Sequence, residues 1–259
     1  MRKRLQNIKS KGDSLSLLLA LLVIWQLVCS LKLVPPFLLP SPISVVRAFA
    51  VDFVPIMGHA AVSLAEAFAG LFLGVAGAFV LAILMDRSDY LYQALYPIIL
   101  ITQTVPTVAL APLLVLWMGY GPAPKIVLVF LVCFFPVAVG LLDGFREADP
   151  DTMVLLRSMG ANEGQIFLHL KLPGALPRLF SGLRIAVSYA IVGAVIAEWL
   201  GGSSGLGVYM TRVRKSYAFD KMFAIIFFVS GLSILLMRLT ALLEKKMTPW
   251  ARQGERKDS

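Results

Sequence analysis

The sequence predicts an all-α, polytopic membrane protein, and three observations lead to that class. Hydrophobic residues make up 58% of the 259 residues and charged residues only 15%, which is more apolar than an ordinary soluble domain. The apolar residues gather in runs of roughly the 20 residues that a helix needs to cross about 30 Å of hydrocarbon. The alternation of apolar and polar residues that is typical of β-barrel strands is not visible. In lipid, a spanning helix forms all of its backbone hydrogen bonds internally. We expect about six transmembrane helices, at residues 15–34, 60–85, 96–118, 125–145, 182–200 and 222–243.

The positive charges predict the orientation of these helices. The net charge of +9 could indicate a nucleic-acid partner, but Lys and Arg stand at the ends of the apolar runs, so we expect no nucleic acid. With a cytoplasmic N-terminus, 17 of the 24 Lys and Arg lie inside and seven outside. The positive-inside rule favours this arrangement. It places cytoplasmic tails at residues 1–14 and 244–259, the second of them basic, around one transmembrane domain at residues 15–243.

The first run could also be a signal peptide, but no small-residue cleavage pattern follows it, so we expect a membrane span. A connection punctuated by prolines follows at residues 35–58. In the second run, Gly70 and Gly74 have the spacing that lets another helix approach closely. Cys29 and Cys133 both lie within runs, where a thiol acts as a small apolar side chain, so we expect neither a disulfide nor a metal site.

The third run contains Pro97, Pro106 and Pro112. Proline removes a backbone donor and bends or breaks a helix unless its neighbours satisfy the freed carbonyls. Helices of this kind often line a pathway, which makes Pro106 and Pro112 candidate pathway residues. The prolines are equally compatible with the ordinary enrichment of proline in membrane helices.

Residues 149–177 form a loop between the fourth and fifth runs, and its sequence predicts two short capped helices. Asp149 can cap a helix whose first residue is Pro150, where the missing amide is harmless. Met153, Leu156 and Met159 would form one apolar face of this helix. Gly160 then suits the left-handed position that closes a helix.

The second half of the loop begins at Asn162, which can cap a helix together with Gln165 three residues on. Pro173 should end this helix. Apolar residues on the aqueous side need a partner, so a docking surface is the natural interpretation. An amphipathic segment on the inner membrane surface is the alternative.

The loop also resembles that of a known family. Residues 155–162, Leu-Leu-Arg-Ser-Met-Gly-Ala-Asn, followed by Leu172-Pro173 and Leu176-Pro177, resemble the coupling loop of bacterial binding-protein-dependent ABC transporter permeases. The similarity is to the branch that carries nitrate, sulfonates, taurine and a pyrimidine precursor of the thiamine pathway. Further matches stand in order at Leu39-Pro-Ser-Pro42, His59, Ser63-Leu64, Pro106, Pro112-Leu113, Leu116-Trp117, Gly119, Gly121, Phe134-Phe-Pro136, Gly182-Leu-Arg184, Ala197-Glu198 and Gly205-Leu-Gly207.

This resemblance implies the type I ABC importer permease fold, with residues 149–177 as the coupling loop. One departure concerns the family's usual Glu-Ala-Ala before the coupling glycine, which is Val154-Leu155-Leu156 here. We therefore expect a more apolar contact with the ATPase. The residues expected to couple the chain to the ATPase are Val154, Leu155, Leu156, Met159, Gly160, Ala161, Asn162, Phe167, Leu172 and Pro173.

The chain contains no Gly-x-x-x-x-Gly-Lys-Ser/Thr phosphate loop, so ATP has to bind a separate subunit. The resemblance implies a multi-pass subunit of the bacterial cytoplasmic (inner) membrane. Its partners would be two copies of an ABC ATPase carrying ATP and Mg, a second permease copy in a homodimer, and an extracytoplasmic solute-binding protein. The chain itself would be a transport subunit without catalytic activity, cofactor or metal.

Glu198 is the first candidate for a pathway residue, because an acidic side chain within a span is costly and functional by default. It stands near the outer end of its run beside Trp199, so a hydrated carboxylate at the external mouth is equally compatible. Glu66 is placed similarly, with structure or solvation as its simpler role. His59 and His169 are too far apart in the chain to indicate a metal site.

Two other functional classes stay open. A secondary transporter would need internal repeats and discontinuous helices, and no repeat is visible. A membrane-embedded enzyme would need paired carboxylates or His/Glu metal spacing, and neither occurs. The expected solute is small and polar or anionic. Residues 197–207 and Trp250 resemble the pyrimidine-precursor permeases slightly more than the sulfonate permeases.

Overall fold

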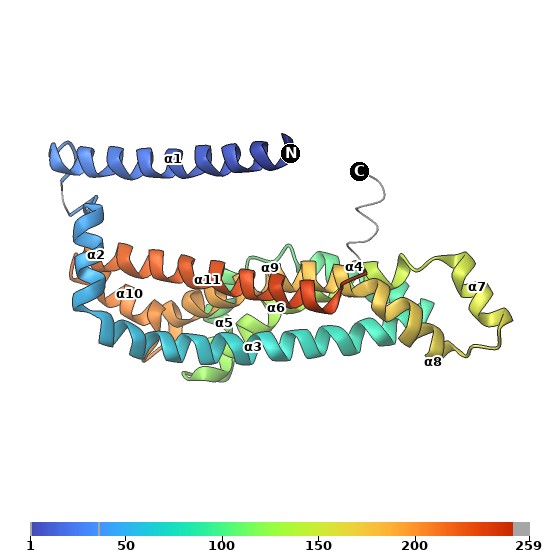
Figure 1. Cartoon of the computed structure of the whole chain (residues 1–259). Coiled ribbons are helices and arrows are strands. Elements are labelled where there is room, and N and C mark those ends of the chain that lie inside the picture. The colour runs from blue at the N-terminus through green and yellow to red at the C-terminus, as the bar shows by residue number, and fades with distance from the viewer. Residues whose placement is uncertain (1, 36, 251–259) are drawn as a thin grey trace. The chain divides into compact units, whose positions relative to one another are not determined.

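The computed structural model describes residues 2–35 and 37–250, with side chains from residue 16 onward, and this part of the chain is all-helical with no strand. The all-α prediction is therefore confirmed. The elements in order are α1 (Arg2–Ser30), α2 (Pro42–Val51), α3 (Phe53–Arg87), α4 (Asp89–Thr102), α5 (Thr107–Met118), α6 (Pro122–Arg146), α7 (Pro150–Ser158), α8 (Glu163–Ile166), a π-helical turn η1 (Phe167–Lys171), α9 (Leu172–Gly201), α10 (Leu206–Lys215) and α11 (Phe219–Met247) (Figure 1).

Four helical segments among the described residues are long and apolar enough to span a membrane: Phe53–Arg87, Pro122–Arg146, Glu163–Gly201 and Phe219–Met247. The pair α4 and α5 makes a fifth candidate if both are counted as one bent span. We expected about six spans, the first at residues 15–34. There α1 ends at Ser30, and Lys32 adopts a left-handed φ of 54°. Within the residues whose side chains the structure describes, this helix gives a shorter apolar segment, Ser16–Ser30.

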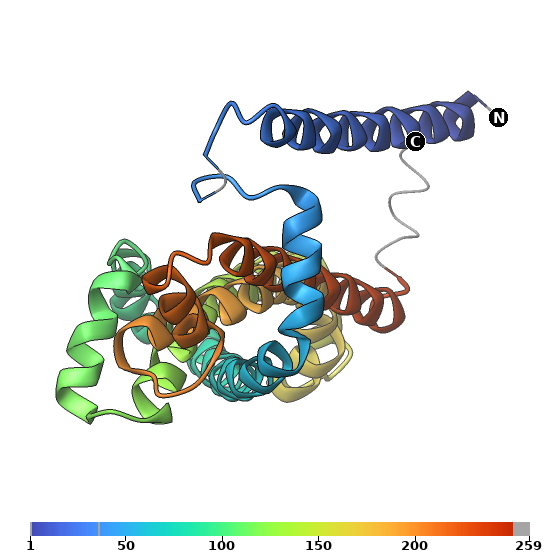
Figure 2. The same cartoon turned by 90° about the vertical axis from the view of Figure 1, so that its left-hand side faces the viewer.

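The third predicted span is not one helix, and the expected boundaries at residues 96–118 are wrong. Helix α4 begins at Asp89, α5 ends at Met118, and the two are bent by 99° at residues 103–106. Pro106 explains the break, because its ring cannot donate to the ladder and the residue before it is disfavoured in the α region. Figure 2 shows this green part of the chain to one side of α3.

The chain divides into two compact units. The first comprises residues up to Gly58 together with Tyr209–Phe228, and the second comprises His59–Val208 together with the chain from Val229. Within the first unit, Trp25 donates to the carbonyl of Pro40 (3.1 Å) and packs beside Phe223 and Phe227. Asp52 accepts a hydrogen bond from Tyr209 and forms an ion pair with Lys221 (2.7 Å).

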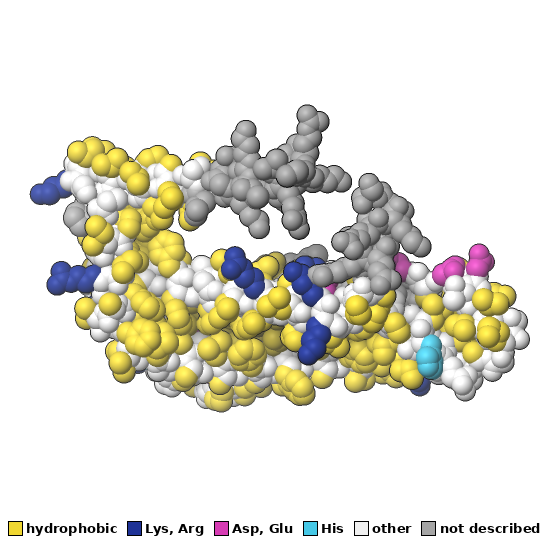
Figure 3. Space-filling view, viewed as in Figure 1, with side chains coloured by type: hydrophobic (Ala, Val, Ile, Leu, Met, Phe, Trp, Pro, Cys, Tyr) yellow, Lys and Arg dark blue, Asp and Glu magenta, His cyan; other side chains and the backbone are white. Residues whose placement is uncertain are grey.

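The second unit is built on α3, α6 and α9, which lie side by side (Figure 1). A Cβ at Gly70 would lie 2.5 Å from that of Val129, and one at Gly74 would lie 3.1 Å from that of Cys133. The prediction that this glycine pair admits a neighbouring helix is thus confirmed, and the neighbour is α6. Hydrophobic side chains cover the visible face over α3, as expected for a surface in contact with lipid (Figure 3).

Helices α6 and α9 pack most closely where Gly182 meets the carbonyl of Pro136. Gly140 and Gly144 extend this contact, because a Cβ at either would meet the backbone of Arg178 or Ala175 within 2.8 Å. Small residues at these positions let two apolar helices approach without a driving force from water. The contact fixes α9, whose two ends carry the functional features described below.

Candidate functional site

The loop at residues 149–177 begins with the predicted capped helix. The carboxylate of Asp149 accepts hydrogen bonds from the amides of Asp151 (3.2 Å) and Thr152 (3.3 Å), and Pro150 is the first helical residue. The Thr152 hydroxyl also donates to this carboxylate (2.5 Å) and is the main cause of an Asp149 pKa below its usual value. The predicted start of α7 is confirmed.

The turn between the two helices also follows the prediction. Gly160 has a φ of +88°, a conformation that side chains with a Cβ rarely adopt. Beyond it, the side chain of Asn162 accepts from the amide of Gln165 (2.8 Å), and the Gln165 side chain accepts from the amide of Asn162 (2.9 Å). Arg157 donates to Glu163 across the turn (3.0 Å). The capping box and the glycine turn are confirmed.

Pro173 does not end the second helix, and that expectation is wrong. From Glu163 the chain runs through α8 and the π-helical turn into α9, so Pro173 and Pro177 both lie inside a continuous helical segment that ends at Gly201. In the π turn the amide of Leu172 donates to Phe167, five residues back. The wider turn removes the clash that a proline ring makes with the carbonyl four residues earlier.

The base of the loop is anchored to the helices of the second unit. Lys171 donates to both oxygens of Asp86 at the end of α3 (2.8 and 3.0 Å), and both side chains are largely buried. The rings of Phe167 and Phe145 lie 5.2 Å apart, and Arg178 pairs with Glu147. These contacts attach the protrusion to α3, α6 and α9 at once.

The tip of the protrusion exposes large apolar side chains. Val154 is 64% exposed, Leu155 58% and Met159 74%, and α7 and α8 extend beyond the end of α3 (Figure 1). Of the expected face of Met153, Leu156 and Met159, only Met159 is exposed, because Met153 lines a cavity of about 250 Å³ at the loop's base and Leu156 is half-buried. Of the other predicted coupling residues, Gly160 and Asn162 are exposed, and those half-buried are Ala161, Phe167, Leu172 and Pro173.

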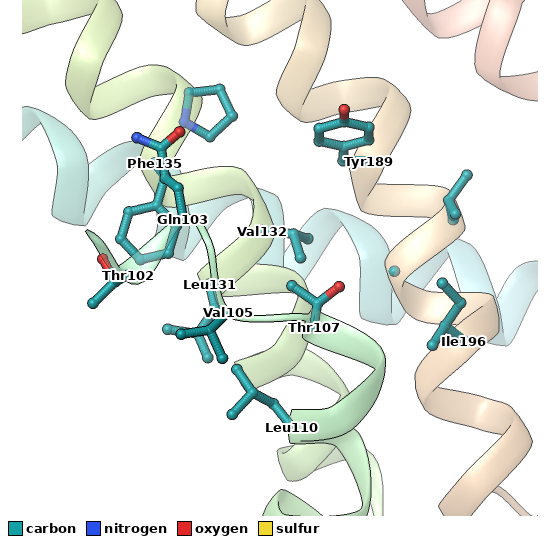
Figure 4. A pocket seen from close by; sticks show the side chains of 13 residues that line it. Thr102, Gln103, Val105, Thr107, Leu110, Leu131, Val132, Phe135, Tyr189 and Ile196 are labelled. Atoms are coloured by element: carbon teal, nitrogen blue, oxygen red, sulfur yellow. The ribbon is translucent and has the colours of Figure 1, made fainter. Parts of the chain in front are cut away.

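Residues 103–106 separate α4 from α5, and we call this segment the break. A cavity of about 500 Å³ lies beside it. Figure 4 shows its lining, with Gln103 and Thr107 beside the break and Tyr189 and Ile196 on α9. Val132 and Phe135 of α6 contribute apolar surface. Pro106 caps α5 between two lining residues, whereas Pro112 lies farther along α5 and is exposed. The sequence pointed to the break through its prolines but did not identify Gln103, Thr107 or Tyr189.

Glu198 does not line this cavity. It is 1% exposed, and its carboxylate accepts hydrogen bonds from the Ser63 hydroxyl (2.6 Å) and the amide of Gly207 (2.6 Å). Ser63 in turn accepts from the amide of Leu206 (2.8 Å), and the amide of Gly205 donates to His59 (3.1 Å). We call these six residues the Glu198 network. A carboxylate so enclosed holds the turn before α10 in place.

Glu66 is also enclosed rather than hydrated. Its carboxylate pairs with Lys125 at 2.6 Å, and the two residues are 5% and 4% exposed. The pair joins α3 to the first turn of α6. A buried pair of this kind specifies how two helices meet more than it stabilises them. His169 lies far from His59 in the chain and contacts the carbonyl of Gln165 (2.9 Å).

The chain was compared with known protein families, and residues 70–249 match the binding-protein-dependent transport system inner membrane component family. The chain belongs to this family. It is therefore the permease component of a binding-protein-dependent ABC importer. The cavity at the break and the loop at residues 149–177 both lie within the matched residues.

The relatives of this permease are named for several different transported compounds. The formylaminopyrimidine transport permease protein ThiX of Halalkalibacterium halodurans is 36% identical over 91% of this chain and 94% of its own length. The taurine transport system permease protein TauC of Escherichia coli is 32% identical over 92% and 89%. A chain of the MetNI methionine ABC transporter, solved in an inward-facing conformation, matches in structure with a TM-score of 0.66 and 19% identity, over 75% of this chain and 96% of that one. This last similarity shows the shared fold.

Proposed function

We propose that this permease forms the solute pathway of an ATP-driven importer and that residues 149–177 couple it to a separate ATPase. The observation that carries the proposal is the exposure of Val154, Leu155 and Met159 at the tip of a protrusion. Three large apolar side chains exposed at the end of a protruding loop fit a helix-in-groove contact with a partner. The family's usual Glu-Ala-Ala before Gly160 is Val154-Leu155-Leu156 here, so we expect this docking to be more apolar.

The anchoring of the loop supports a mechanical role. A force on α7 passes through the Gly160 turn and the Arg157–Glu163 ion pair into the helical segment that begins at Glu163. The same segment continues as α9 past Tyr189 at the cavity. Because packed helices move as rigid bodies, a displacement at the tip changes the cavity walls. Coupling of this kind is reciprocal, so solute at the cavity also influences the ATPase.

We propose the remaining architecture from the family. Two permease copies, two ATPase copies binding ATP and Mg, and an external solute-binding protein form the complex, in the bacterial inner membrane with both termini of this chain cytoplasmic. The named substrates of the relatives include formylaminopyrimidine, taurine, aliphatic sulfonates and nitrate. The solute is accordingly a small polar or anionic molecule.

The test is Gly160→Val in the complete transporter. At a φ of +88° the β-branched side chain is strained, so the turn distorts while the spans still insert. We expect membrane insertion and ATP hydrolysis to persist and ATP-driven uptake into vesicles to fall about tenfold or more, a loss of about 1.4 kcal/mol or more in coupling. Gly231→Val is the matched control, because a Cβ at that helical glycine meets nothing within 4 Å. Normal uptake by the Gly160 variant contradicts the proposal.

A secondary transporter is the alternative that the sequence left open, and the family match argues against it, although the break has a counterpart in that class. Discontinuous helices at a central cavity are the structures that ion-coupled transporters use. Uptake by the permease alone, driven by an ion gradient and unaffected by removal of the ATPase, would establish this alternative.

A further inference from the structure

The cavity at the break is lined by four polar side chains and by no charged one. Among its 13 lining residues in the described chain there is no Lys, Arg, His, Asp or Glu. The Gln103 carboxamide, the Thr107 hydroxyl and the Tyr189 hydroxyl have no hydrogen-bond partner in the part of the chain that the structure describes. The Thr102 hydroxyl, in contrast, bonds to the carbonyls of Ile98 (2.9 Å) and Ile99 (2.8 Å). Three neutral groups are therefore left for a solute.

The backbone at the break is also close to electrically balanced. The C-terminal end of α4 carries a partial negative charge and the N-terminal end of α5 a partial positive charge of similar size. Both ends meet at residues 103–106, and α5 has no side-chain cap among the described residues. The break thus offers acceptors and donors together. A solute with both kinds of group satisfies it better than an ion of either sign.

The remaining lining is apolar and partly aromatic. Phe135 and Tyr189 contribute rings, and Leu110, Val132 and Ile196 contribute aliphatic surface. Rings of this kind favour offset or edge contacts with another flat ring. The volume of about 500 Å³ accommodates a one-ring or two-ring molecule.

We propose that the cavity at the break selects an uncharged aromatic heterocycle that carries amino or amide groups and rejects small inorganic and sulfonate anions. This rests on the proposed function of the chain as the solute pathway. An anion would exchange its hydration shell for a cavity without a compensating cation, which is costly.

The experiment uses the full-length permease with its ATPase in membrane vesicles. Val192 lines the cavity and is 42% exposed, so Val192→Cys places a near-isosteric thiol there and leaves Gln103, Thr107 and Tyr189 intact. The rate of maleimide alkylation at residue 192, read by peptide mass spectrometry, is measured with cytosine, ethanesulfonate or nitrate present. We expect cytosine to slow alkylation about fivefold at about four times its dissociation constant. We expect neither anion to slow it.

Two further variants in the Val192→Cys background test the chemistry. Gln103→Leu should abolish protection by cytosine, whereas Thr104→Val should not, because Thr104 is not among the lining residues and bonds to Ile101. Gln103→Arg should reverse the preference of the cavity, so that ethanesulfonate protects residue 192 from alkylation better than cytosine does. Equal or better protection by an anion in the parent, or no protection by cytosine, overturns the inference.

Alkylation reports solute contact and is independent of ATP. Protection by an anion together with ATP-driven uptake therefore refutes the selectivity but keeps the proposed function. Protection by cytosine without any ATP-dependent uptake keeps the selectivity but refutes the proposed function.

Discussion

At the residue scale, the two buried glutamates show how a charged side chain inside a span can serve structure. Glu198 and Glu66 each lie below a tenth of full exposure, and each has a partner from a distant part of the chain, Ser63 for the first and Lys125 for the second. Sequence reasoning placed both glutamates near the outer ends of their spans. It left Glu198 open between solute contact and hydration, and it favoured structure or solvation for Glu66. The partners of Glu198 are brought to it by the fold, so no local pattern reveals them.

The Glu198 network predicts an order of variant stability. Glu198→Leu leaves the amide of Gly207 and the Ser63 hydroxyl without their acceptor, which costs about 2–4 kcal/mol. Glu198→Gln should cost about 1 kcal/mol or less, because the amide oxygen can face Gly207 while Ser63 accepts from the amide nitrogen and redirects its own proton to the His59 carbonyl. Melting of the purified permease in detergent measures this difference. A Gln variant that is stable yet unable to take up solute would instead assign Glu198 to the pathway.

At the element scale, the local and the tertiary parts of the fold differ in how far they could be predicted. The cap at Asp149, the turn at Gly160 and the capping box at Asn162 depend on neighbours within three residues, and all three were predicted. The continuation of the helix through Pro173 and the break before Pro106 depend on a π turn and on packing. Both prolines were noticed in the sequence, but its pattern does not decide which one interrupts a helix.

The packing of α6 on α9 predicts opposite results for two glycines of the same helix. A Cβ at Gly182 would overlap the Pro136 carbonyl, so Gly182→Ala has to separate the helices and should cost about 3 kcal/mol. A Cβ at Gly174 meets nothing within 4 Å, so Gly174→Ala should be neutral or stabilise by about 0.5–1 kcal/mol through helix propensity. Thermal melting of both variants makes the comparison. Equal melting temperatures would show that this contact does not hold the unit together.

At the scale of the whole molecule, α9 connects the two ends of the second unit. Its 30 residues rise about 45 Å, which exceeds the hydrocarbon thickness of about 30 Å. The loop at residues 149–177 leads into one end, the cavity at the break lies alongside, and the Glu198 network closes the other end. Four or five candidate spans are found among the described residues where about six were expected, and the basic tail beyond Trp250 lies outside the described residues. The orientation of α9 in the membrane therefore determines on which side the loop at residues 149–177 and the Glu198 network lie.

That orientation can be tested with two exposed serines. Ser158 stands at the end of α7 and Ser203 follows α9, so a cysteine at each should react with a membrane-impermeant maleimide from opposite sides. The positive-inside rule places the loop inside, because Arg157, Lys171 and Arg178 surround it. We expect Ser158→Cys to react in inside-out vesicles and Ser203→Cys in right-side-out vesicles. The parent chain controls for Cys29 and Cys133. Labelling of both sites from one side would mean that α9 does not cross the membrane, and reversed labelling would place the coupling loop away from the ATP supply.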